Sequence, residues 1–473
     1  MLNKKTKIVA TISDKNCGVP FLTDLFNCGM NAVRLNTAHQ DPEDTIKVVK
    51  NVREVSDRIA ILVDTKGPEI RTNPTDKVLK VEKGDIVLVR GEPGKKSYDN
   101  TICMSYSDIV RDVPTGSRLL IDDGDIELIV KSVKNDHLVC EAGNPGIIMG
   151  RKSVNIPGAD INLPALSDRD REFVQVAIDE DIDFIAHSFV RNKEDLLEIQ
   201  EILDKHNSRV KIIAKIENQS GVDNIDEILD HAYGIMVARG DLAIEIPYAK
   251  IPGIQKMLID KCIQRRKPVI IATQMLHSMI TNPRPTRAEV SDIANAIYSQ
   301  TDAIMLSGET AYGSYPLESL HTMASVAGEV EKTKEPINDI PVVVVNNRIS
   351  AFLIKTAVKA AVDLSAKAII ADSMSGRTIR GLTAYRGSKM IWAKVYDRRV
   401  VRELALSYGV NAHYMEPSET SHEFVQQAVN SLVSEGVVKD NSLVVVIAGN
   451  FGHSTGASYV EIGTVKNLLK ELN

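Results

Sequence analysis

Eight short apolar runs recur along the chain, and helical patterns separate most of them. Continuous apolar runs that are rich in β-branched residues are typical of strands buried on both faces of a parallel sheet. Eight such strands alternating with helices predict an α/β fold of the (β/α)₈ (TIM) barrel type, although an open doubly wound sheet would also explain the alternation. The runs are residues 8–12, 31–36, 59–65, 183–189, 210–217, 234–241, 268–274 and 302–309.

The barrel pattern is interrupted after its third run. Residues 73–155 contain short apolar stretches separated by turn sequences such as Asp122-Asp-Gly124, which predicts a small inserted all-β domain. We assign residues 1–72 and 156–336 to the barrel. Because the insertion follows the end of a barrel strand, we interpret it as a hinged lid over the barrel mouth, with a passive structural insertion as the alternative.

The C-terminal part, residues 337–473, predicts a separate α/β domain. A helix is expected at 349–366 and strands at 368–372, 389–393 and 442–448. The first of these strands leads into a loop rich in hydroxyl groups and then into a helix start, which suits a phosphate; an ordinary helix cap is the alternative. The candidate phosphate-binding residues are Ser373, Ser375, Gly376, Arg377 and Thr378.

Length and composition exclude several classes of protein. At 473 residues the chain is too long for one ordinary core, and its net charge of −6 argues against a nucleic-acid partner. No apolar run approaches membrane-spanning length, and the N-terminal segment lacks a signal-peptide core, so we expect a cytoplasmic protein with no membrane partner. The five cysteines show no C-x-x-C spacing, which favours reduced thiols and no zinc site.

Charged residues end the fifth and sixth runs. Lys215 and Glu217 close one run and Asp241 closes the next, so adjacent parallel strands would bring a lysine and two carboxylates to one edge. Two carboxylates suit Mg²⁺ and a neighbouring lysine suits a phosphate, whereas a surface ion cluster is the structural alternative. Further polar residues end the other runs at the same predicted mouth: Arg34, Asn36, Asp64, Lys66, Ser188, Thr273, Gln274, Ser307 and Glu309.

Several longer stretches resemble the pyruvate kinase family. They include Gly29-Met-Asn-Ala-Val-Arg-Leu-Asn36, Val63-Asp-Thr-Lys-Gly-Pro-Glu-Ile-Arg-Thr72, Ala214-Lys-Ile-Glu-Asn218 and Gly234-Ile-Met-Val-Ala-Arg-Gly-Asp-Leu242. The resemblance runs from the first predicted strand nearly to the last. It implies a phosphotransferase of glycolysis that moves the phosphoryl group of phosphoenolpyruvate to ADP, giving pyruvate and ATP. It also implies a homotetramer that is regulated by a phosphorylated metabolite, such as a sugar phosphate.

The resemblance also implies roles for individual residues. Lys215 and Arg34 would hold the phosphoryl group, Glu217 and Asp241 would bind Mg²⁺ (or Mn²⁺), and Gly240 with Asp241 and Thr273 would contact the substrate. Thr273, Ser307 and Glu309 would line the side from which the enolate receives a proton. The nucleotide contacts would be Asn36, Thr37, Ala38, His39, Arg71 and Lys152.

A potassium site is implied as well, with one departure from the family pattern. Asn36, Asp64 and Thr65 stand at the expected K⁺ ligands, but Ala38 replaces the usual serine. K⁺ activation is therefore an open expectation.

Two other functions are compatible with parts of this pattern. A Mg²⁺-dependent barrel lyase of the citrate-lyase β-subunit kind could use the same Glu217 and Asp241 pair, but it would need neither the lid nor Lys215. A non-enzymatic sugar-phosphate sensor would be expected to have lost at least one of these three residues, and all three are present.

Overall fold

The predicted barrel is present and closed. The computed structural model describes residues 4–159, 161–334, 347–449, 451 and 456–470. Each barrel strand pairs in parallel with its two neighbours, and the closed order excludes an open doubly wound sheet. Going round the barrel, the strands are β1 (Lys7–Thr11), β17 (Ala303–Leu306), β16 (Val269–Ala272), β15 (Gly234–Ala238), β14 (Lys211–Ile216), β13 (Phe184–His187), β3 (Ala60–Asp64) and β2 (Ala32–Asn36).

Helices surround this barrel, and side-chain caps fix where two of them begin. The side chains of Ser167 and Thr286 each accept a hydrogen bond from a backbone N–H in the first turn of the helix. The acidic side chain of that same first-turn residue accepts the backbone N–H of the serine or threonine, so two N–H groups that lack partners within the helix are satisfied. The crossover between β14 and β15 contains two helices, α6 (Gln219–Asp223) and α7 (Ile225–His231). The others are α1 (Val19–Asn27), α2 (Pro42–Val55), α4 (Asp168–Asp179), α5 (Lys193–Lys205), α8 (Arg239–Glu245), α9 (Ile251–Gln264), α10 (Arg287–Tyr298), α11 (Gly308–Ala311) and α12 (Pro316–Thr333).

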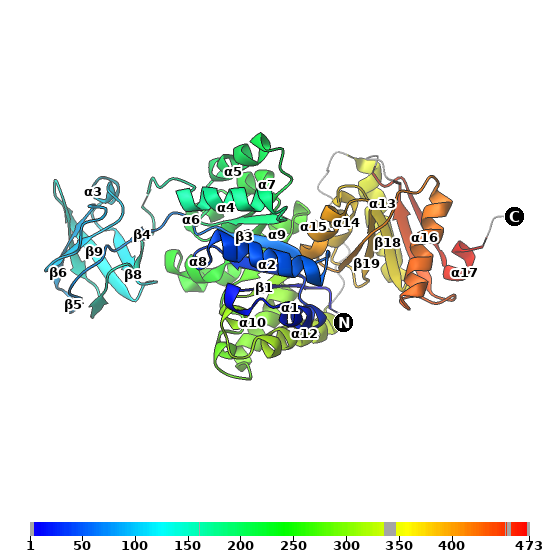
Figure 1. Ribbon diagram of the computed structural model, residues 1–473, viewed down its shortest axis with the longest axis horizontal. Coiled ribbons are helices and arrows are strands. Elements are labelled where there is room, and N and C mark those ends of the chain that lie inside the picture. The colour runs from blue at the N-terminus through cyan, green and yellow to red at the C-terminus, as the bar shows by residue number, and fades with distance from the viewer. Residues whose placement is uncertain (1–3, 160, 335–346, 450, 452–455, 471–473) are drawn as a thin grey trace.

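The inserted domain stands beyond one end of the barrel, at the left of Figure 1. A seven-stranded sheet forms most of it, and a two-stranded sheet and one short helix, α3 (Ile109–Asp112), complete it. The seven-stranded sheet has the order β4 (Ile70–Arg71), β12 (Ser153–Asn155), β8 (Arg118–Ile121), β9 (Ile126–Val133), β10 (Leu138–Ala142), β6 (Ile86–Arg90) and β7 (Thr101–Cys103), and β11 (Gly146–Ile148) pairs with β5 (Leu79–Val81).

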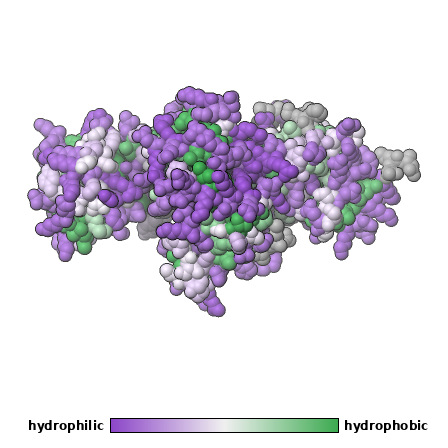
Figure 2. Space-filling view, viewed as in Figure 1, coloured by the Kyte–Doolittle hydropathy of each residue, from purple (hydrophilic) through white to green (hydrophobic). Residues whose placement is uncertain are grey.

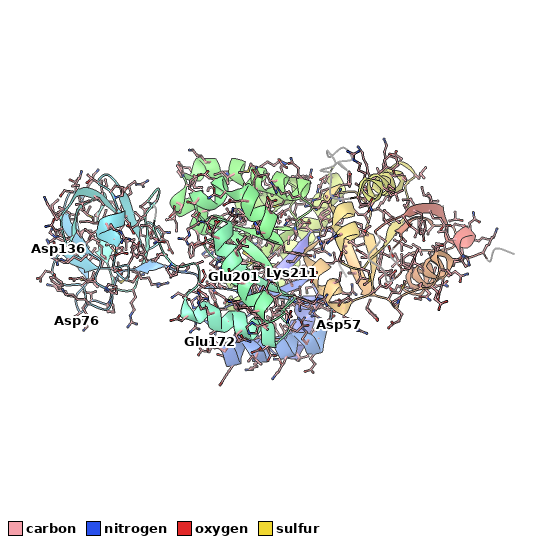
Figure 3. All side chains as sticks on the ribbon, turned by 90° about the horizontal axis from the view of Figure 1, so that it is seen from above. Asp57, Asp76, Asp136, Glu172, Glu201 and Lys211 are labelled. Carbon is pink, nitrogen blue, oxygen red and sulfur yellow. The ribbon has the colours of Figure 1, made fainter. Side chains whose placement is uncertain are left out.

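The C-terminal domain is a five-stranded sheet at the opposite end of the barrel, so the three parts lie in a row (Figures 1 and 3). Its strand order is β20 (Val410–Tyr414), β19 (Ile391–Val395), β18 (Ala368–Ser373), β21 (Leu443–Ala448) and β22 (Tyr459–Thr464), with only β22 antiparallel. The predicted boundary between residues 336 and 337 lies outside the described residues. The helices are α13 (Arg348–Asp363), α14 (Arg377–Ala384), α15 (Arg398–Glu403), α16 (Ser421–Ser434) and α17 (Val465–Leu468).

The visible surface is mainly hydrophilic, with separate apolar patches (Figure 2). In the described part of the chain, no helix combines the length and the hydropathy needed to cross a membrane.

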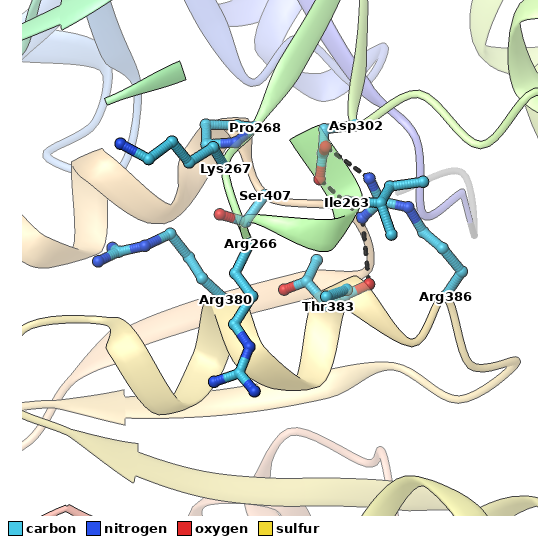
Figure 4. A pocket seen from close by; sticks show the side chains of 10 residues that line it. Ile263, Arg266, Lys267, Pro268, Asp302, Arg380, Thr383, Arg386 and Ser407 are labelled. Atoms are coloured by element: carbon cyan, nitrogen blue, oxygen red, sulfur yellow. Dashed lines mark hydrogen bonds and ion pairs between the residues drawn. The ribbon is translucent and has the colours of Figure 1, made fainter. Parts of the chain in front are cut away.

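Buried ion pairs join the C-terminal domain to the N-terminal ends of the barrel strands. Asp302, just before β17, accepts two hydrogen bonds from Arg386, at 2.6 and 2.9 Å (Figure 4). Asp183, just before β13, pairs with Arg402 at 2.6 Å. Because all four side chains are at most 10% exposed, these pairs fix the domain against the floor of the barrel, opposite the mouth.

Candidate active site

Lys215 lies inside the barrel at the C-terminal end of β14. Its neighbour two residues earlier, Ile213, belongs to the apolar layer that fills the barrel. Because side chains alternate along a strand, Lys215 points the same way, above that layer. Its Nζ lies 3.0 Å from Asp64 Oδ1 and 3.0 Å from Glu217 Oε1, and it donates to Ser188 Oγ at 2.6 Å. The lysine is therefore held by three groups from three strand ends.

The charges around Lys215 keep it protonated. Burial by itself lowers the pKa of Lys215, but the negative charges of Asp64 and Glu217 raise it above its usual value. For Asp64, burial raises the pKa, but the positive charges of Arg34 and Lys215 hold that pKa below its usual range. The mouth thus contains a permanent cation that is fixed before any substrate arrives.

Arg34 approaches the same carboxylate from the other side. Its Nε donates to Asp64 Oδ2 at 2.6 Å, and Nη1 lies 3.3 Å from Thr11 Oγ1. Arg34 also lines an open cavity of about 750 Å³ at the mouth. Asp64 therefore sets the positions of both cations, and an anionic group at the mouth would meet two fixed positive charges.

Glu217 and Asp241 form an acidic pair beside Lys215. Burial raises the pKa of each carboxylic acid, and the negative charge of Asp241 raises that of Glu217 further. The backbone N–H of Phe189 donates to Glu217 Oε2 at 2.7 Å, which fixes this side chain.

This pair has the chemistry of a divalent-cation site. A hard cation would relieve the repulsion between the two carboxylates, and their oxygens are the ligands that Mg²⁺ prefers. No cluster of three or more potential metal-ligating side chains occurs within the described ranges. The pair would consequently leave most of an octahedral coordination shell for water and substrate.

The loop after β16 has a strained backbone. Thr273 and Gln274 have φ angles of 69° and 55°, a region that non-glycine residues rarely adopt. Thr273 Oγ1 accepts the N–H of Gly240 at 2.8 Å, and its carbonyl oxygen accepts Arg239 Nη2 at 2.8 Å. Such strain persists only where neighbouring contacts enforce it, so the loop places Thr273 at a defined position beside Gly240.

Glu309 joins two loops of the mouth through backbone groups. Its Oε2 accepts the N–H of Ser307 at 2.7 Å, and its Oε1 accepts the N–H of Leu276 at 3.1 Å. Glu309 is buried, whereas Ser307 lines the 750 Å³ cavity with Arg34. The carboxylate orients the two loops, and the serine faces the space they enclose.

The predicted nucleotide residues occupy two places. Asn36 and His39 line the 750 Å³ cavity at the end of β2. Arg71 and Lys152 lie instead on the stem that leads to the inserted domain, where Arg71 bonds Glu69 at 2.7 Å and Lys152 pairs with Asp122 at 2.8 Å. The lining of the cavity includes neither of these two residues.

The predicted potassium ligands already have hydrogen-bond partners. Asn36 Oδ1 accepts the N–H of Ala38 at 3.2 Å, and the carbonyl oxygen of Thr65 accepts Ser188 Oγ at 2.6 Å. The buried hydroxyl of Thr37 donates to the carbonyl oxygen of Asp64 at 2.9 Å.

The candidate effector loop connects β18 to α14. Ser373 and Thr378 are buried, whereas Ser375 and Arg377 are exposed. Gly376 precedes the helix with a φ of 73°, which favours glycine because it has no Cβ.

Ser188 is a site residue whose role could not be predicted from the sequence. It accepts the hydrogen bond of Lys215 and lies 3.3 Å from Asp64 Oδ1. Its position at the end of a predicted strand was the available signal, because six of the other seven predicted strands also end in polar residues at the mouth.

Comparisons with known proteins show the family to which the chain belongs. Residues 3–320 match the family model described as pyruvate kinase, barrel domain, and residues 352–462 match pyruvate kinase, alpha/beta domain. The chain belongs to the pyruvate kinase family. It is 46% identical to a pyruvate kinase of Borreliella burgdorferi over the full length of both chains. It is 40% identical to one of Bacillus licheniformis, covering 98% of this chain and 81% of the relative.

A solved structure extends the likeness to three dimensions. The crystal structure of a pyruvate kinase from Cryptosporidium parvum superposes with a TM-score of 0.92 at 34% sequence identity, covering 98% of this chain and 96% of that one. Barrel, inserted domain and C-terminal domain therefore all have counterparts in a pyruvate kinase.

Proposed function

We propose that this chain is a pyruvate kinase that transfers the phosphoryl group of phosphoenolpyruvate to ADP, giving pyruvate and ATP. The observation that carries the proposal is the buried Lys215, which is held between Asp64 and Glu217 with Arg34 on the far side of Asp64. Phosphoryl transfer needs little covalent chemistry from the protein and depends on fixed positive charge around the moving group. Lys215 and Arg34 supply that charge.

The substrate carboxylate would bind at the strained loop. The hydroxyl of Thr273, which accepts the Gly240 N–H and still has its own proton to donate, is the donor that we assign to the substrate carboxylate. Binding the carboxylate and the phosphoryl group of the substrate together would hold the phosphoryl group in line with ADP. This orientation lowers the activation barrier, because the reacting groups are already positioned.

Cations complete the site. Glu217 and Asp241 would hold Mg²⁺ (or Mn²⁺), which when bound supplies charge neutralisation on the substrate and phosphoryl oxygens. Asn36, Asp64 and Thr65 are the proposed K⁺ ligands. Because Ala38 stands where the family has a serine, this set lacks one hydroxyl ligand of the family pattern.

ADP would bind between the barrel and the inserted domain. Asn36, Thr37, Ala38 and His39 would contact it from the barrel, and Arg71 and Lys152 from the stem of the lid. Closure of the lid would bring these two groups together and exclude water from the phosphoryl group.

Transfer leaves an enolate that must receive a proton at carbon. The hydroxyls of Thr273 and Ser307 are the groups we assign to a relay through water, and Glu309 positions both loops. Because both Glu309 oxygens accept backbone N–H groups, we assign Glu309 to positioning and not to donation.

The remaining expectations concern organisation. We propose that residues 73–155 act as the lid, that the loop formed by Ser373, Ser375, Gly376, Arg377 and Thr378 binds a phosphorylated effector, and that the protein works as a homotetramer in the cytoplasm. In this proposal the barrel carries out catalysis, the lid closes over the substrates, and the regulatory domain binds the effector.

An assay of pyruvate formation tests the proposal. Purified protein is mixed with phosphoenolpyruvate, ADP and Mg²⁺, with and without K⁺, and pyruvate is measured through coupled lactate dehydrogenase. We expect pyruvate that depends on ADP and on the divalent cation. Absence of ADP-dependent pyruvate from folded protein, across Mg²⁺, Mn²⁺ and K⁺, would refute the proposed function.

A further inference from the structure

The inserted domain joins the barrel through two segments (Figure 1). The outgoing segment, residues 65–69, follows β3, and the returning segment, residues 156–159 and 161–163, follows β12. One loop of the barrel, residues 188–191 after β13, contacts both segments through Phe189 and Arg191. A movement of the domain relative to the barrel would therefore change the contacts of this loop.

Arg191 holds the returning segment by its backbone. Nη1 of Arg191 donates to the carbonyl oxygen of Ile161 at 3.1 Å, and Nη2 donates to that of Leu163 at 3.0 Å. Asp195 orients the same guanidinium, because its carboxylate accepts Nε at 3.1 Å and Nη2 at 2.8 Å and is buried in the first turn of α5. The planar fork of arginine can bind a carboxylate and still donate to two carbonyl oxygens, whereas a lysine presents a single nitrogen.

The side chains of the returning segment belong to the inserted domain. Ile156 is buried in the apolar core of that domain, and Ala159, Ile161 and Leu163 pack against this core. Arg191 thus binds the backbone of a segment whose side chains are part of the domain. The positions of Arg191 and of the domain are consequently linked.

Phe189 connects the same loop to the outgoing segment and to the acidic pair of the mouth. A Cβ on Gly67 would lie 2.8 Å from Cδ2 of Phe189, so this ring packs directly against the backbone of the outgoing segment. The N–H of Phe189 donates to Glu217 Oε2 at 2.7 Å, and its φ is 55°. Such a backbone is rare for a bulky residue and persists only where contacts enforce it, so Glu217 and Gly67 help to hold the loop.

The loop is also fixed between Phe189 and Arg191. Val190 is fully buried. The N–H of Arg191 donates to Asp195 Oδ2 at 2.8 Å, and its carbonyl oxygen accepts Asn224 Nδ2 at 2.9 Å. Because close-packed segments transmit strain, a restraint on Phe189 also restrains Arg191.

We propose that Arg191 is a positioning residue that couples a divalent cation on Glu217 and Asp241 to the position of the inserted domain. The inference rests on the proposed function of the metal site and of the lid, and it adds the connection between them. With a cation between them the two carboxylates no longer repel each other, so Glu217 is fixed and the N–H of Phe189 with it. Arg191 passes this restraint to the carbonyl oxygens of the returning segment.

Hydrogen–deuterium exchange of the full-length chain with and without Mn²⁺, in the absence of phosphoenolpyruvate and ADP, tests the coupling. The readout is the exchange rate of peptides that contain Ile161 and Leu163, and calorimetric titration reports Mn²⁺ binding separately. We expect Mn²⁺ to slow this exchange by about fivefold or more in the unmodified chain. Arg191→Lys should bind Mn²⁺ without this slowing, because lysine keeps a positive charge beside Asp195 but lacks the fork.

Arg171→Gln is the matched control. Arg171 of α4 pairs with Glu198 of α5, so both partners lie on the barrel, and the arginine side chain is 47% exposed. This variant should show the same slowing by Mn²⁺ as the unmodified chain. Thermal denaturation of each variant checks that it is folded.

Equal slowing in Arg191→Lys and in the unmodified chain would overturn the inference. Binding of Mn²⁺ that leaves the exchange of the unmodified chain unchanged would overturn it as well. Both results would leave the proposed metal site intact. Absence of Mn²⁺ binding would instead refute that metal site, and the inference with it.

Discussion

Replacing Arg386 by leucine should loosen the junction between the barrel and the C-terminal domain. The guanidinium donates two hydrogen bonds to Asp302, and the two side chains are 2% and 4% exposed. In Arg386→Leu the hydrogen bonds that the carboxylate keeps to described residues are those from the N–H groups of Val269 and Tyr408, at 3.2 and 3.0 Å. A buried charge that loses its partner costs about 3–5 kcal/mol of unfolding free energy.

The matched control is an exposed ion pair across the same junction. Arg398 pairs with Asp57 of the barrel at 2.7 Å, but the side chains are 63% and 56% exposed. Exposed pairs contribute about 0–1 kcal/mol because water and salt screen them. Arg398→Leu should therefore leave the free energy of unfolding nearly unchanged.

The single tryptophan of the chain makes the measurement specific. Trp392 lies in β19 of the C-terminal sheet and is 9% exposed, so its fluorescence reports unfolding of that domain in urea. With an m-value of about 2 kcal/mol per M, the loss in Arg386→Leu corresponds to a midpoint lowered by about 2 M. Equal midpoints for the two variants would refute the claim that buried pairs hold the junction.

Three further substitutions test the active site. Ala38→Ser should strengthen activation by K⁺, because it restores a hydroxyl beside Asn36; an unchanged K⁺ titration would show that this hydroxyl is unimportant. Thr273→Val removes the acceptor of the Gly240 N–H and should lower kcat/KM for phosphoenolpyruvate by about tenfold or more, with Thr273→Ser retaining most of it. Lys152→Met should raise the KM for ADP more than that for phosphoenolpyruvate, and equal effects on both would argue against a nucleotide contact from the lid stem.

The barrel could be predicted from the sequence because its strands are buried on both faces. Eight continuous apolar runs that alternate with helices are compatible with few folds apart from a closed barrel and an open doubly wound sheet. Strands with polar residues gave no such signal. β20 contains Asn411 and His413, β22 contains Glu461 and Gly463, and neither was predicted. The crossover between β14 and β15 divides into two helices at Asn224, and the apolar spacing does not indicate this break because it continues across it.

The active-site residues were predictable as a group, but their contacts were not. Strand order and the alternation of side chains bring Lys215 and Glu217 to one mouth. That Asp64 lies between Lys215 and Arg34, and that Ser188 accepts from Lys215, depends on register across four strands and on side-chain rotamers. The same limit applies to the junction, where the pairing of Asp302 with Arg386 joins residues 84 positions apart.

ATP formation by a Lys215→Met variant tests the central claim most directly. The account predicts that removal of the fixed cation lowers the rate from phosphoenolpyruvate and ADP by about 100-fold or more, whereas Lys205→Met, which alters an exposed lysine, keeps the wild-type rate. Circular dichroism and thermal denaturation establish that the variant is folded. A folded Lys215→Met protein that forms ATP at nearly the wild-type rate would contradict the account.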